Sequence, residues 1–485
     1  MVNTGWNFDN TYRKLSQDFY SIVHPVPVNK PELILLNTRI ADELGLDFSK
    51  KDRSELASIF TGNQLPDGAE PIAQAYAGHQ FGHFTMLGDG RAIVLGEHVS
   101  PDGKRFDIQF KGSGRTPYSR SGDGRATLYS MLREYLISEA LYHLRIPASG
   151  SLAVVETGLP VYRESVHPGA VLTRVASSHI RIGTFEYAAR FLSREKQHEF
   201  LDYTIARHYA DLGEADNIAL GLLKRVADKH LNLVIEWMRI GFIHGVLNTD
   251  NMSISGESID FGPCSFMNAF NPSTAFSSVD INKRYAFSNQ PGIVQWNLAI
   301  FAGTLLRFID DDEEKAREVA QEVIIEFESR FEGEWYRMMG NKLGFNKTGK
   351  QEKELINKLL SWMQRSEADY TNTFLIIYDP VKIPGHFKAD ENFHNWHLEW
   401  KTLIEKMHGG LSEAHRRMAR VNPLYIPRNH LVEEALTEAS TDGNYTKFHR
   451  LLNLLKNPYQ EEWKAIELQQ VPPGFDEQYK TYCGT

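Results

Sequence analysis

Residues 242–262 read FIHGVLNTDNMSISGESIDFG and form the most informative segment of the chain. A helix precedes it, predicted from apolar residues at helical spacing, which are Ala227, Leu231, Val234, Ile235 and Met238. Asp250-Asn251 lies in a loop and Asp260 follows in a second loop. Carboxylate and amide oxygens from two neighbouring loops are hard ligands suited to Mg²⁺ or Mn²⁺, which bind nucleotide phosphates. The alternative is a solvated turn, since Asn-Thr-Asp-Asn is also good turn chemistry.

The order of these residues resembles the catalytic loop and the DFG segment of protein kinases, with Asp260-Phe261-Gly262 as the triplet. A kinase-like fold requires a strand lysine and, further along the chain, a helical glutamate that pairs with it. Residues 106–111 alternate apolar and polar side chains as a strand does, and they end at Lys111. Glu134 lies within the helix predicted over residues 127–144. The pattern therefore predicts a Lys111–Glu134 pair.

Glycine turns and short strands fill the rest of the first 185 residues. Residues 92–95 and 170–175 each predict a strand, and residues 151–163 predict two strands joined by a turn at 157–160. Arg174 and Arg181 lie around the end of the last strand. Backbone N–H groups of glycine turns and arginine forks bind phosphate oxygens. Such turns are Gly88-Asp89-Gly90-Arg91, Gly112-Ser113-Gly114-Arg115 and Gly122-Asp123-Gly124-Arg125.

Beyond residue 185 the chain becomes mainly helical. The acidic run at residues 310–314 predicts the start of a helix, where the dipole favours negative charge, rather than a metal site. The predicted fold class is α+β: a bilobal, protein-kinase-like fold with a small β-rich N-lobe, one key helix and a large helical C-lobe. The expected parts are an N-terminal extension (1–70), the N-lobe (71–185), the C-lobe (186–330) and a C-terminal helical extension (331–485).

Composition excludes several other classes. The 485 residues include 53 basic and 62 acidic side chains, a net charge of −9 that disfavours general nucleic-acid binding. Two cysteines exclude cysteine-rich zinc modules and indicate a reducing compartment. No secretory signal and no apolar run of membrane length is evident, so we expect a cytoplasmic protein that binds no membrane. His79 and His83 are assigned a structural role, because no third metal ligand lies nearby.

One departure separates this chain from ordinary kinases. In the kinase loop, an aspartate two positions after the histidine orients the attacking hydroxyl. Aligned on His244, the loop places Val246 at that position, and the carboxylate reappears at Asp250, directly before Asn251. An ordinary protein kinase should not tolerate this substitution.

Long motifs across nearly the whole chain resemble the selenoprotein O (SelO) family of pseudokinases. They are YAGHQFG (76–82), LGDGRA (87–92), QFKGSGRTPYSRSGDGRA (109–126), HGVLNTDNMSI (244–254), DFGPC (260–264), ADYTNTF (368–374) and the final YCGT (482–485). The resemblance implies a kinase-like fold that binds its nucleotide flipped relative to kinases. It also implies an enzyme that moves AMP from ATP, or UMP from UTP, onto Ser, Thr or Tyr hydroxyls of proteins, with Mg²⁺ or Mn²⁺.

The same resemblance implies a role for each site residue. Asp250 would be the general base, Asn251 and Asp260 would hold the metal, and Lys111 would contact phosphate while pairing with Glu134. Residues expected to bind the nucleotide are Gly88, Gly90, Arg91, Lys111, Asp123, Gly124, Arg174, Arg181 and Asp260. Cys264 and Cys483 are a possible redox-sensitive pair, with two unrelated thiols as the alternative. A cysteine in place of selenocysteine near the C-terminus suggests a bacterial member. A kinase that transfers the γ-phosphate and an inactive nucleotide-binding scaffold remain as alternatives.

Overall fold

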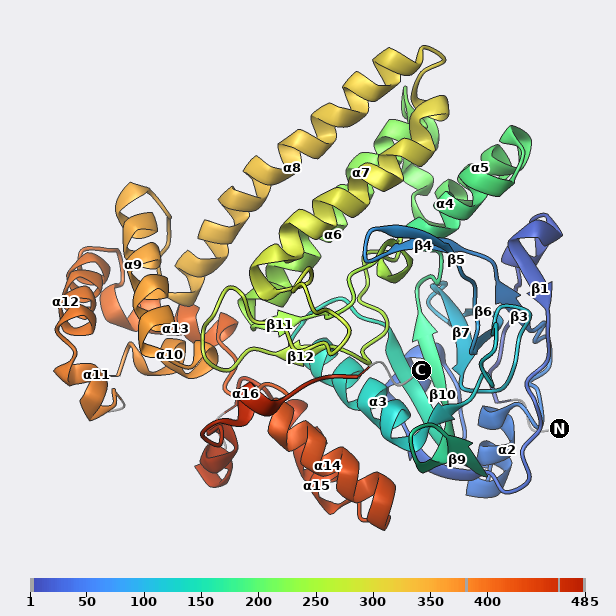
Figure 1. The fold of residues 1–485 in the computed structure, drawn as a ribbon, viewed down its shortest axis with the longest axis horizontal. Coiled ribbons are helices and arrows are strands. Elements are labelled where there is room, and N and C mark those ends of the chain that lie inside the picture. Colours follow the sequence, from blue (N-terminus) through green and yellow to red (C-terminus); the bar gives the residue numbers. More distant parts are fainter. Residues whose placement is uncertain (1–3, 380–382, 461–462, 483–485) are drawn as a thin grey trace.

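The computed structural model describes residues 4–379, 383–460 and 463–482 (Figure 1). Its β-rich part is an antiparallel sheet in the strand order β1-β3-β6-β7-β10-β9-β2, with β8 paired to β10. The strand bounds are β1 (Tyr20–Ile22), β2 (Glu32–Leu36), β3 (Ile72–Gln74), β6 (Ala92–Val99), β7 (Arg105–Lys111), β8 (Ala126–Thr127), β9 (Gly150–Tyr162) and β10 (Val166–Ala176).

The strands predicted at residues 92–95, 106–111 and 170–175 are confirmed as β6, β7 and β10. The prediction of two strands within residues 151–163 is wrong, because β9 runs through the whole stretch. β10 pairs with both halves of β9, and the turn-like residues Thr157–Pro160 are absorbed as a register shift opposite Pro168–Ala170. A long partner strand therefore overrides local turn chemistry.

Helices cover both faces of this sheet. Helix α3 (Leu128–His143) begins where the Thr127 side chain accepts a hydrogen bond from Ser130 N, and it confirms the helix predicted at 127–144. Side chains of β10 alternate between the faces: Leu172 packs with α3. Val171 packs in the cluster formed with α1 (Thr38–Leu44) and α2 (Arg53–Thr61).

The second part of the molecule is helical, as predicted (Figure 1). Its first helices are α4 (Ile182–Phe191), α5 (Arg194–His208), α6 (Ile218–Arg239), α7 (Gln290–Ile309) and α8 (Glu313–Lys342). The acidic run is confirmed as a helix start, since Asp312 caps α8 and accepts from Glu314 N and Lys315 N. The remaining helices are α9 (Lys350–Ser366), α10 (Tyr370–Ile376), α11 (Gly385–Ala389), α12 (Glu391–Glu405), α13 (Gly410–Val421), α14 (Asn429–Asp442), α15 (Thr446–Leu455) and α16 (Phe475–Gln478).

The expectation that no apolar run reaches membrane length needs correction. Residues Phe287–Ile309 form one helical segment that is long and apolar enough to cross a membrane by length and composition. Within this structure α7 packs between neighbouring helices α4, α6 and α8 and buries Val294, Leu298 and Phe301. Its apolar residues therefore serve the core of the helical part.

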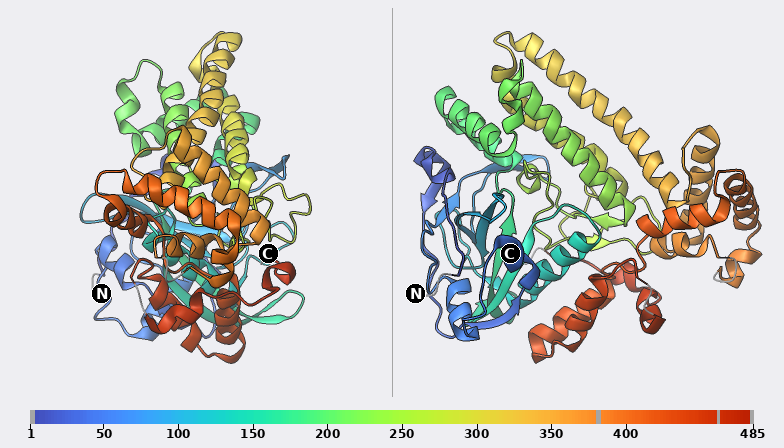
Figure 2. Two further views of the ribbon diagram at one scale, coloured as in Figure 1. Left: turned by 90° about the vertical axis from the view of Figure 1, so that its left-hand side faces the viewer. Right: turned by 180° about the vertical axis from the view of Figure 1, so that it is seen from behind.

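The end of the chain returns to the β-rich part. Helices α14 and α15 pack on the outer side of α3, at the bottom of the view in Figure 2. Leu436 and Phe448 share one apolar cluster with Leu132, and Arg133 of α3 forms an ion pair with Glu433 at 3.1 Å. The main sheet also takes β1 and β2 from the first 70 residues. The part boundaries at residues 70, 185 and 330 stay predictions.

Two irregular segments join the parts. The loop after α6 contains β11 (Phe242–Ile243), a 3₁₀ turn η4 (Thr249–Asn251) and β12 (Ser265–Phe266), which pairs with β11. The hairpin of β4 (Ala77–Gln80) and β5 (His83–Met86) extends from the sheet and packs on α4 and η4. Between them lies the candidate site.

Candidate active site

A buried ion-pair cluster lies where β7 meets α3. Lys111, the last residue of β7, donates from Nζ to Glu134 Oε1 and to Asp260 Oδ1, each at 2.8 Å. Arg174 of β10 donates from Nη2 to the other Glu134 oxygen at 2.7 Å. The predicted pair is therefore present, with the Asp of the DFG segment as its third member. This geometry is that of a protein kinase, and it confirms the predicted kinase-like arrangement of the two parts.

The cluster keeps both carboxylates ionised. Burial opposes the charge of Glu134, but Lys111 and Arg174 hold the pKa of its carboxyl below the usual value. Burial also opposes the charge of Asp260, yet Lys111, Arg91 and Arg174 hold its pKa well below the usual value. Lys111 and Arg174 thus balance the two carboxylates, and the charge of Arg91 also acts on Asp260. Cations gathered at one site favour a bound phosphate.

Asp260 adopts an unusual backbone conformation in the loop before β12. Its φ of 64° lies in the left-handed region, which is uncommon for a residue with a side chain. The following amide, Phe261 N, donates to Glu134 Oε1 at 2.9 Å and fixes this conformation. About a third of the Asp260 side chain is exposed, which leaves its second oxygen open to a ligand.

The Asp250 carboxyl lies in a tight, mostly dry position on η4. It is 7% exposed, and its Oδ1 has no hydrogen-bond partner among the described residues. A Cβ on Gly78 of β4 would lie 2.5 Å from this oxygen, so only glycine fits above it. Burial raises the pKa of Asp250 to about 6, although the charge of Arg181 opposes the rise. A buried carboxylate oxygen without a partner is costly and is typical of functional sites.

Arg181 links this loop to the first glycine turn. Its Nη1 donates to the Asp250 carbonyl oxygen at 3.1 Å, and its Nη2 lies 4.0 Å from Asp89 Oδ1. The guanidinium also stacks over the Tyr76 ring, 4.1 Å from its centroid. Asp89 in turn accepts from Gln74 N at 3.0 Å, which anchors the turn to β3.

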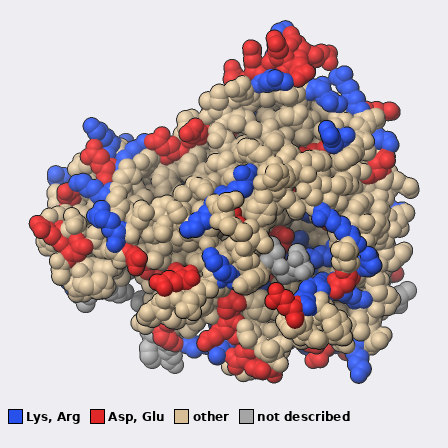
Figure 3. Space-filling model, viewed as in Figure 1, with Lys and Arg blue, Asp and Glu red and all other residues tan. Residues whose placement is uncertain are grey.

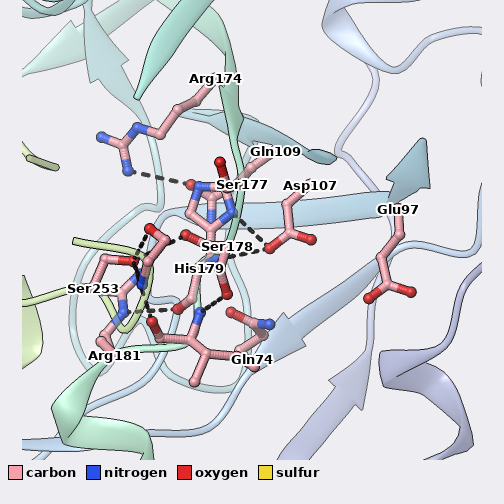
Figure 4. A network of polar contacts seen from close by, with 12 residues as sticks. Gln74, Glu97, Asp107, Gln109, Arg174, Ser177, Ser178, His179, Arg181 and Ser253 are labelled. Carbon is pink, nitrogen blue, oxygen red and sulfur yellow. Dashed lines mark hydrogen bonds and ion pairs between the residues drawn. The ribbon is translucent and has the colours of Figure 1, made fainter. Parts of the chain in front are cut away.

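A polar network behind the cluster positions Arg174 and Arg181 (Figure 4). Arg174 Nη1 donates to Gln109 Oε1 at 3.3 Å, and Arg181 Nε donates to the His179 carbonyl oxygen at 3.2 Å. His179 is anchored through its backbone N, which donates to Asp107 Oδ2 at 2.7 Å. Burial and the two arginines hold the pKa of His179 well below its usual value, so the ring is neutral. Sequence reasoning missed both residues: Asp107 is a polar position within the alternating strand β7, and His179 lies in the short polar run after β10.

The β4–β5 hairpin closes over the catalytic loop. His79 N donates to Thr249 Oγ1 at 2.8 Å, and the His79 ring contacts the Glu186 carboxyl of α4. Phe81 N donates to Asn248 Oδ1 at 3.2 Å. His83 starts the second strand and is exposed. These contacts agree with a structural role for His79, and the role predicted for His83 stays a prediction. The hairpin also covers Asp250 through Gly78, which the sequence alone does not indicate.

The other two glycine turns pack on each other and on the first turn, where Gly112 N donates to Arg91 O at 2.7 Å and Thr116 Oγ1 donates to Asp89 O at 2.6 Å. Gly114 N donates to Gly124 O at 3.1 Å, and a Cβ on Gly124 would lie 2.1 Å from Gly114 O. Asp123 pairs with Arg163 rather than with the Lys111 cluster, at 2.9 Å and 3.1 Å. In Figure 3, Lys and Arg side chains lie between the sheet and the helical part, with several Asp and Glu side chains beside them.

Comparisons with known proteins agree with this site. A family model described as "Protein adenylyltransferase SelO" matches residues 3–456. The chain belongs to the SelO family. A protein of Nitrosococcus oceani is 50% identical over 99% of this chain and 98% of its own length, and one of Pelagibacter ubique is 49% identical over the full length of both. Both relatives are named protein nucleotidyltransferase YdiU, and the chain is a nucleotidyltransferase.

A solved structure with a protein-kinase fold was also matched. ROP2 from Toxoplasma gondii, described as a virulence factor with no enzymatic activity, is 10% identical to this SelO chain. The match covers 68% of this chain and 86% of that one, with a TM-score of 0.24. The kinase-like assignment therefore depends on the Lys111–Glu134–Asp260 geometry and not on this likeness.

The donor set of this SelO chain fits a divalent cation. Asn251 Nδ2 donates to Val246 O at 2.9 Å, which leaves the amide oxygen as the group available to a cation. Asp260 adds its second carboxylate oxygen. Among the described residues no group of three His, Cys, Asp or Glu side chains could hold a metal. Two hard oxygen ligands nevertheless suit Mg²⁺ or Mn²⁺, which take further ligands from water and phosphate.

Cys264 lies directly behind the site and is fully buried. Its Sγ donates to Phe261 O at 3.1 Å, and its carbonyl oxygen accepts from Arg133 Nη2 at 2.6 Å. Burial raises the pKa of the thiol to about 12, so it is protonated at neutral pH. Cys483 lies outside the described residues, and the redox pair stays a prediction.

A buried histidine next to the loop makes stability depend on pH. His230 of α6 donates from Nε2 to Ser253 O at 2.9 Å, and burial lowers its pKa to about 4. Because an unfolded histidine titrates near about 6.5, the unfolded chain binds more protons between these values, and stability falls as pH drops through them. We expect His230→Gln, which keeps an N–H donor but does not titrate, to remove part of this loss.

Urea unfolding at neutral pH and near pH 5 measures the effect. Going to the lower pH should cost the wild type about 2 kcal/mol more than His230→Gln, in free energy of unfolding. Comparing the two chains cancels the contributions of all other titrating groups. Equal pH slopes for both chains would contradict the assignment of His230 as buried and neutral.

Proposed function

We propose that this chain transfers AMP from ATP, or UMP from UTP, to Ser, Thr or Tyr hydroxyls of proteins, including its own, in a reaction that needs Mg²⁺ or Mn²⁺. The observation that carries the proposal is the position of the carboxylates. Val246, at the position of the kinase base, has no polar side-chain atom. Its carbonyl oxygen accepts a hydrogen bond from Asn251 Nδ2. Asp250 has a carboxylate oxygen without a partner, and it adjoins the metal-ligand candidate Asn251.

In this proposal the cations of the cluster bind the phosphates. Lys111, Arg91, Arg174 and Asp260 surround the phosphate chain, and Arg181 connects it to the loop of Asp250. The glycine turns, with Gly88, Gly90, Asp123 and Gly124, contribute backbone N–H groups and close approach. A bound cation held by Asn251 and Asp260 would neutralise phosphate charge. Phosphoryl chemistry depends mainly on such positioning and charge stabilisation.

Asp250 acts as the general base. It takes the proton from the acceptor hydroxyl as the hydroxyl oxygen forms a bond to the α-phosphorus. The bond between the α-phosphorus and its bridging oxygen breaks, and pyrophosphate leaves. A general base must be within hydrogen-bond reach of the proton it removes and must be ionised at the working pH. The oxygen of Asp250 without a partner is suited to this proton.

The position of the label distinguishes this proposal from its alternatives. Protein incubated with α-labelled ATP and Mg²⁺ should become labelled and gain the mass of AMP, with release of pyrophosphate; γ-labelled ATP should leave it unlabelled. A parallel arm with α-labelled UTP compares the two nucleotides. Label from γ-labelled ATP alone would indicate a kinase, and no label from any nucleotide, with ATP bound, would indicate a scaffold. We also propose that the protein is located in the cytoplasm of a bacterial cell.

A further inference from the structure

An open pocket of about 800 Å³ lies beside the catalytic loop, outside the ion-pair cluster. Its wall combines the tip of the β4–β5 hairpin, the loop that follows β12 and the start of α7. The residues used below are Phe81, Val279, Asp280, Ile281 and Arg284.

Asn248 connects this pocket to the site. Its Oδ1 accepts from Phe81 N at 3.2 Å, and it also accepts from the hydroxyl of Tyr285. Asn248 stands two residues before Asp250 in the chain, a span of at most about 7 Å. A peptide bound in the pocket therefore needs only a few residues to reach the proposed base, Asp250.

The pocket carries a cation without a carboxylate partner. The Arg284 guanidinium stacks over the Trp296 ring, 5.0 Å from its centroid, and lies near Tyr285. Asp280, the nearest carboxyl in sequence, accepts instead from the backbone N of Arg284 and of Tyr285, both at 2.8 Å. Within the described part of the chain no carboxylate forms an ion pair with Arg284, and its Nε is buried without a hydrogen-bond partner.

Apolar side chains surround this cation and face solvent. Ile281 is 88% exposed, Val279 49% and Phe81 36%. Large aliphatic side chains are rarely this exposed side by side unless something covers them. The pocket thus offers the Arg284 cation within an apolar rim, a few residues from Asp250, while the Asp280 carboxylate on its wall is engaged by two backbone N–H groups.

We propose that this pocket docks the acceptor protein, as an extended segment with Asp or Glu and an apolar residue close to the hydroxyl that is modified. The inference rests on the proposed function, which supplies a protein as acceptor. Arg284 pairs with the acidic side chain, and Ile281, Val279 and Phe81 cover the apolar one. Charge complementarity selects acidic over basic segments, because a basic side chain would lie against Arg284.

Peptide binding to the full chain tests this proposal without any catalytic step. Two fluorescent peptides share a Leu-Ser-Tyr core and differ only in flanking Glu or Lys residues. Wild type should bind the Glu peptide about tenfold more tightly than the Lys peptide. Arg284→Glu should reverse the order.

Two variants of Ile281 give a second test, because Arg284 also packs on Trp296 whereas the exposed Ile281 side chain supports no packing. Ile281→Glu should weaken binding of the Glu peptide, and Ile281→Lys should strengthen it.

The matched control is Leu398→Glu, on α12, where the side chain is 50% exposed and the helix packs on α9, α11 and α13. It should leave both affinities unchanged, and all variants should still bind ATP. Equal affinities, no binding of either peptide, or an acidic preference that survives both Arg284→Glu and Ile281→Glu would overturn the proposal. So would pyrophosphate that displaces the Glu peptide in an Arg284-dependent way, since the pocket would then belong to the nucleotide.

The failure of docking and the failure of nucleotidyl transfer to protein are distinguishable. Wild type that gains AMP from α-labelled ATP but shows no peptide preference keeps the proposed function and loses the docking site. Wild type that gains no AMP but binds the Glu peptide through Arg284 keeps the surface and loses the proposed activity.

Discussion

Asp250→Asn should abolish nucleotidyl transfer while ATP still binds. The amide has nearly the same shape as the carboxyl but cannot take a proton from the acceptor hydroxyl. Loss of a general base typically lowers a rate by about 10²- to 10⁴-fold, and we expect an effect near the upper end because Asp250 is the only carboxylate on η4. Pyrophosphate release and binding of a fluorescent ATP analogue measure the two quantities separately.

The same substitution should not weaken the fold. Burial raises the pKa of Asp250, which means that the folded state disfavours its charge at neutral pH. A neutral amide removes that penalty, so the unfolding temperature should stay equal or rise. Glu257→Gln is the matched control, because Glu257 is also buried with a raised pKa but hydrogen-bonds to Ser177 and Ser255 instead. Near-normal transfer by Asp250→Asn, or failure to bind ATP, would contradict the role of base.

Local patterns were sufficient to predict the core of the site. Lys111 ends an alternating strand and Glu134 lies in a helix. Because a kinase-like fold pairs a strand lysine with a helical glutamate, the kinase-like loop was enough to predict the ion pair between them. The order of Asp250, Asn251 and Asp260 is likewise a property of one continuous segment. Such residues are predictable because strand and helix periodicity determine which side chains share a face.

Contacts between distant segments were not predictable in the same way. Nothing local to YAGHQFG indicates that Gly78 will lie on Asp250, because the contact depends on how a hairpin packs across the lobes. The docking of α14 on α3, with its Arg133–Glu433 pair, joins residues far apart in sequence. Asp123 was predicted from a family motif, and its pairing with Arg163 has no signal in either neighbourhood. Only tertiary packing brings these groups together.

The proposed phosphate site around Lys111 lies in a chain of net charge −9. The overall charge would repel the ligand, but the charges of the site are local and buried. Interactions in such surroundings are screened less than those at the surface, so Lys111 and Arg174 would act on a bound phosphate more strongly than many distant carboxylates.

Lys111→Ala should therefore affect both activity and stability. It removes the cation that two carboxylates share, and the loss of one group that stabilises phosphate charge typically lowers the rate by about 10²-fold or more. Without Lys111, Arg174 is the remaining cation beside Glu134 and Asp260. The substitution should therefore also lower the free energy of unfolding by about 3 kcal/mol, because breaking a buried ion pair leaves a buried charge without its partner. Kinetics with α-labelled ATP and urea unfolding at neutral pH measure the two effects.

The double variant Lys111→Ala/Glu134→Gln separates contact with phosphate from support of the fold. Lys111→Ala leaves two carboxylates, Glu134 and Asp260, with one nearby cation, Arg174. Glu134→Gln removes one of these two negative charges, so the double variant should be more stable than Lys111→Ala. If Lys111 binds phosphate directly, the double variant should remain as inactive as Lys111→Ala although its fold is restored. Activity that returns together with stability would instead make Lys111 a structural residue. The two outcomes differ because an ion pair can be replaced by neutral groups, whereas a positive charge on phosphate cannot.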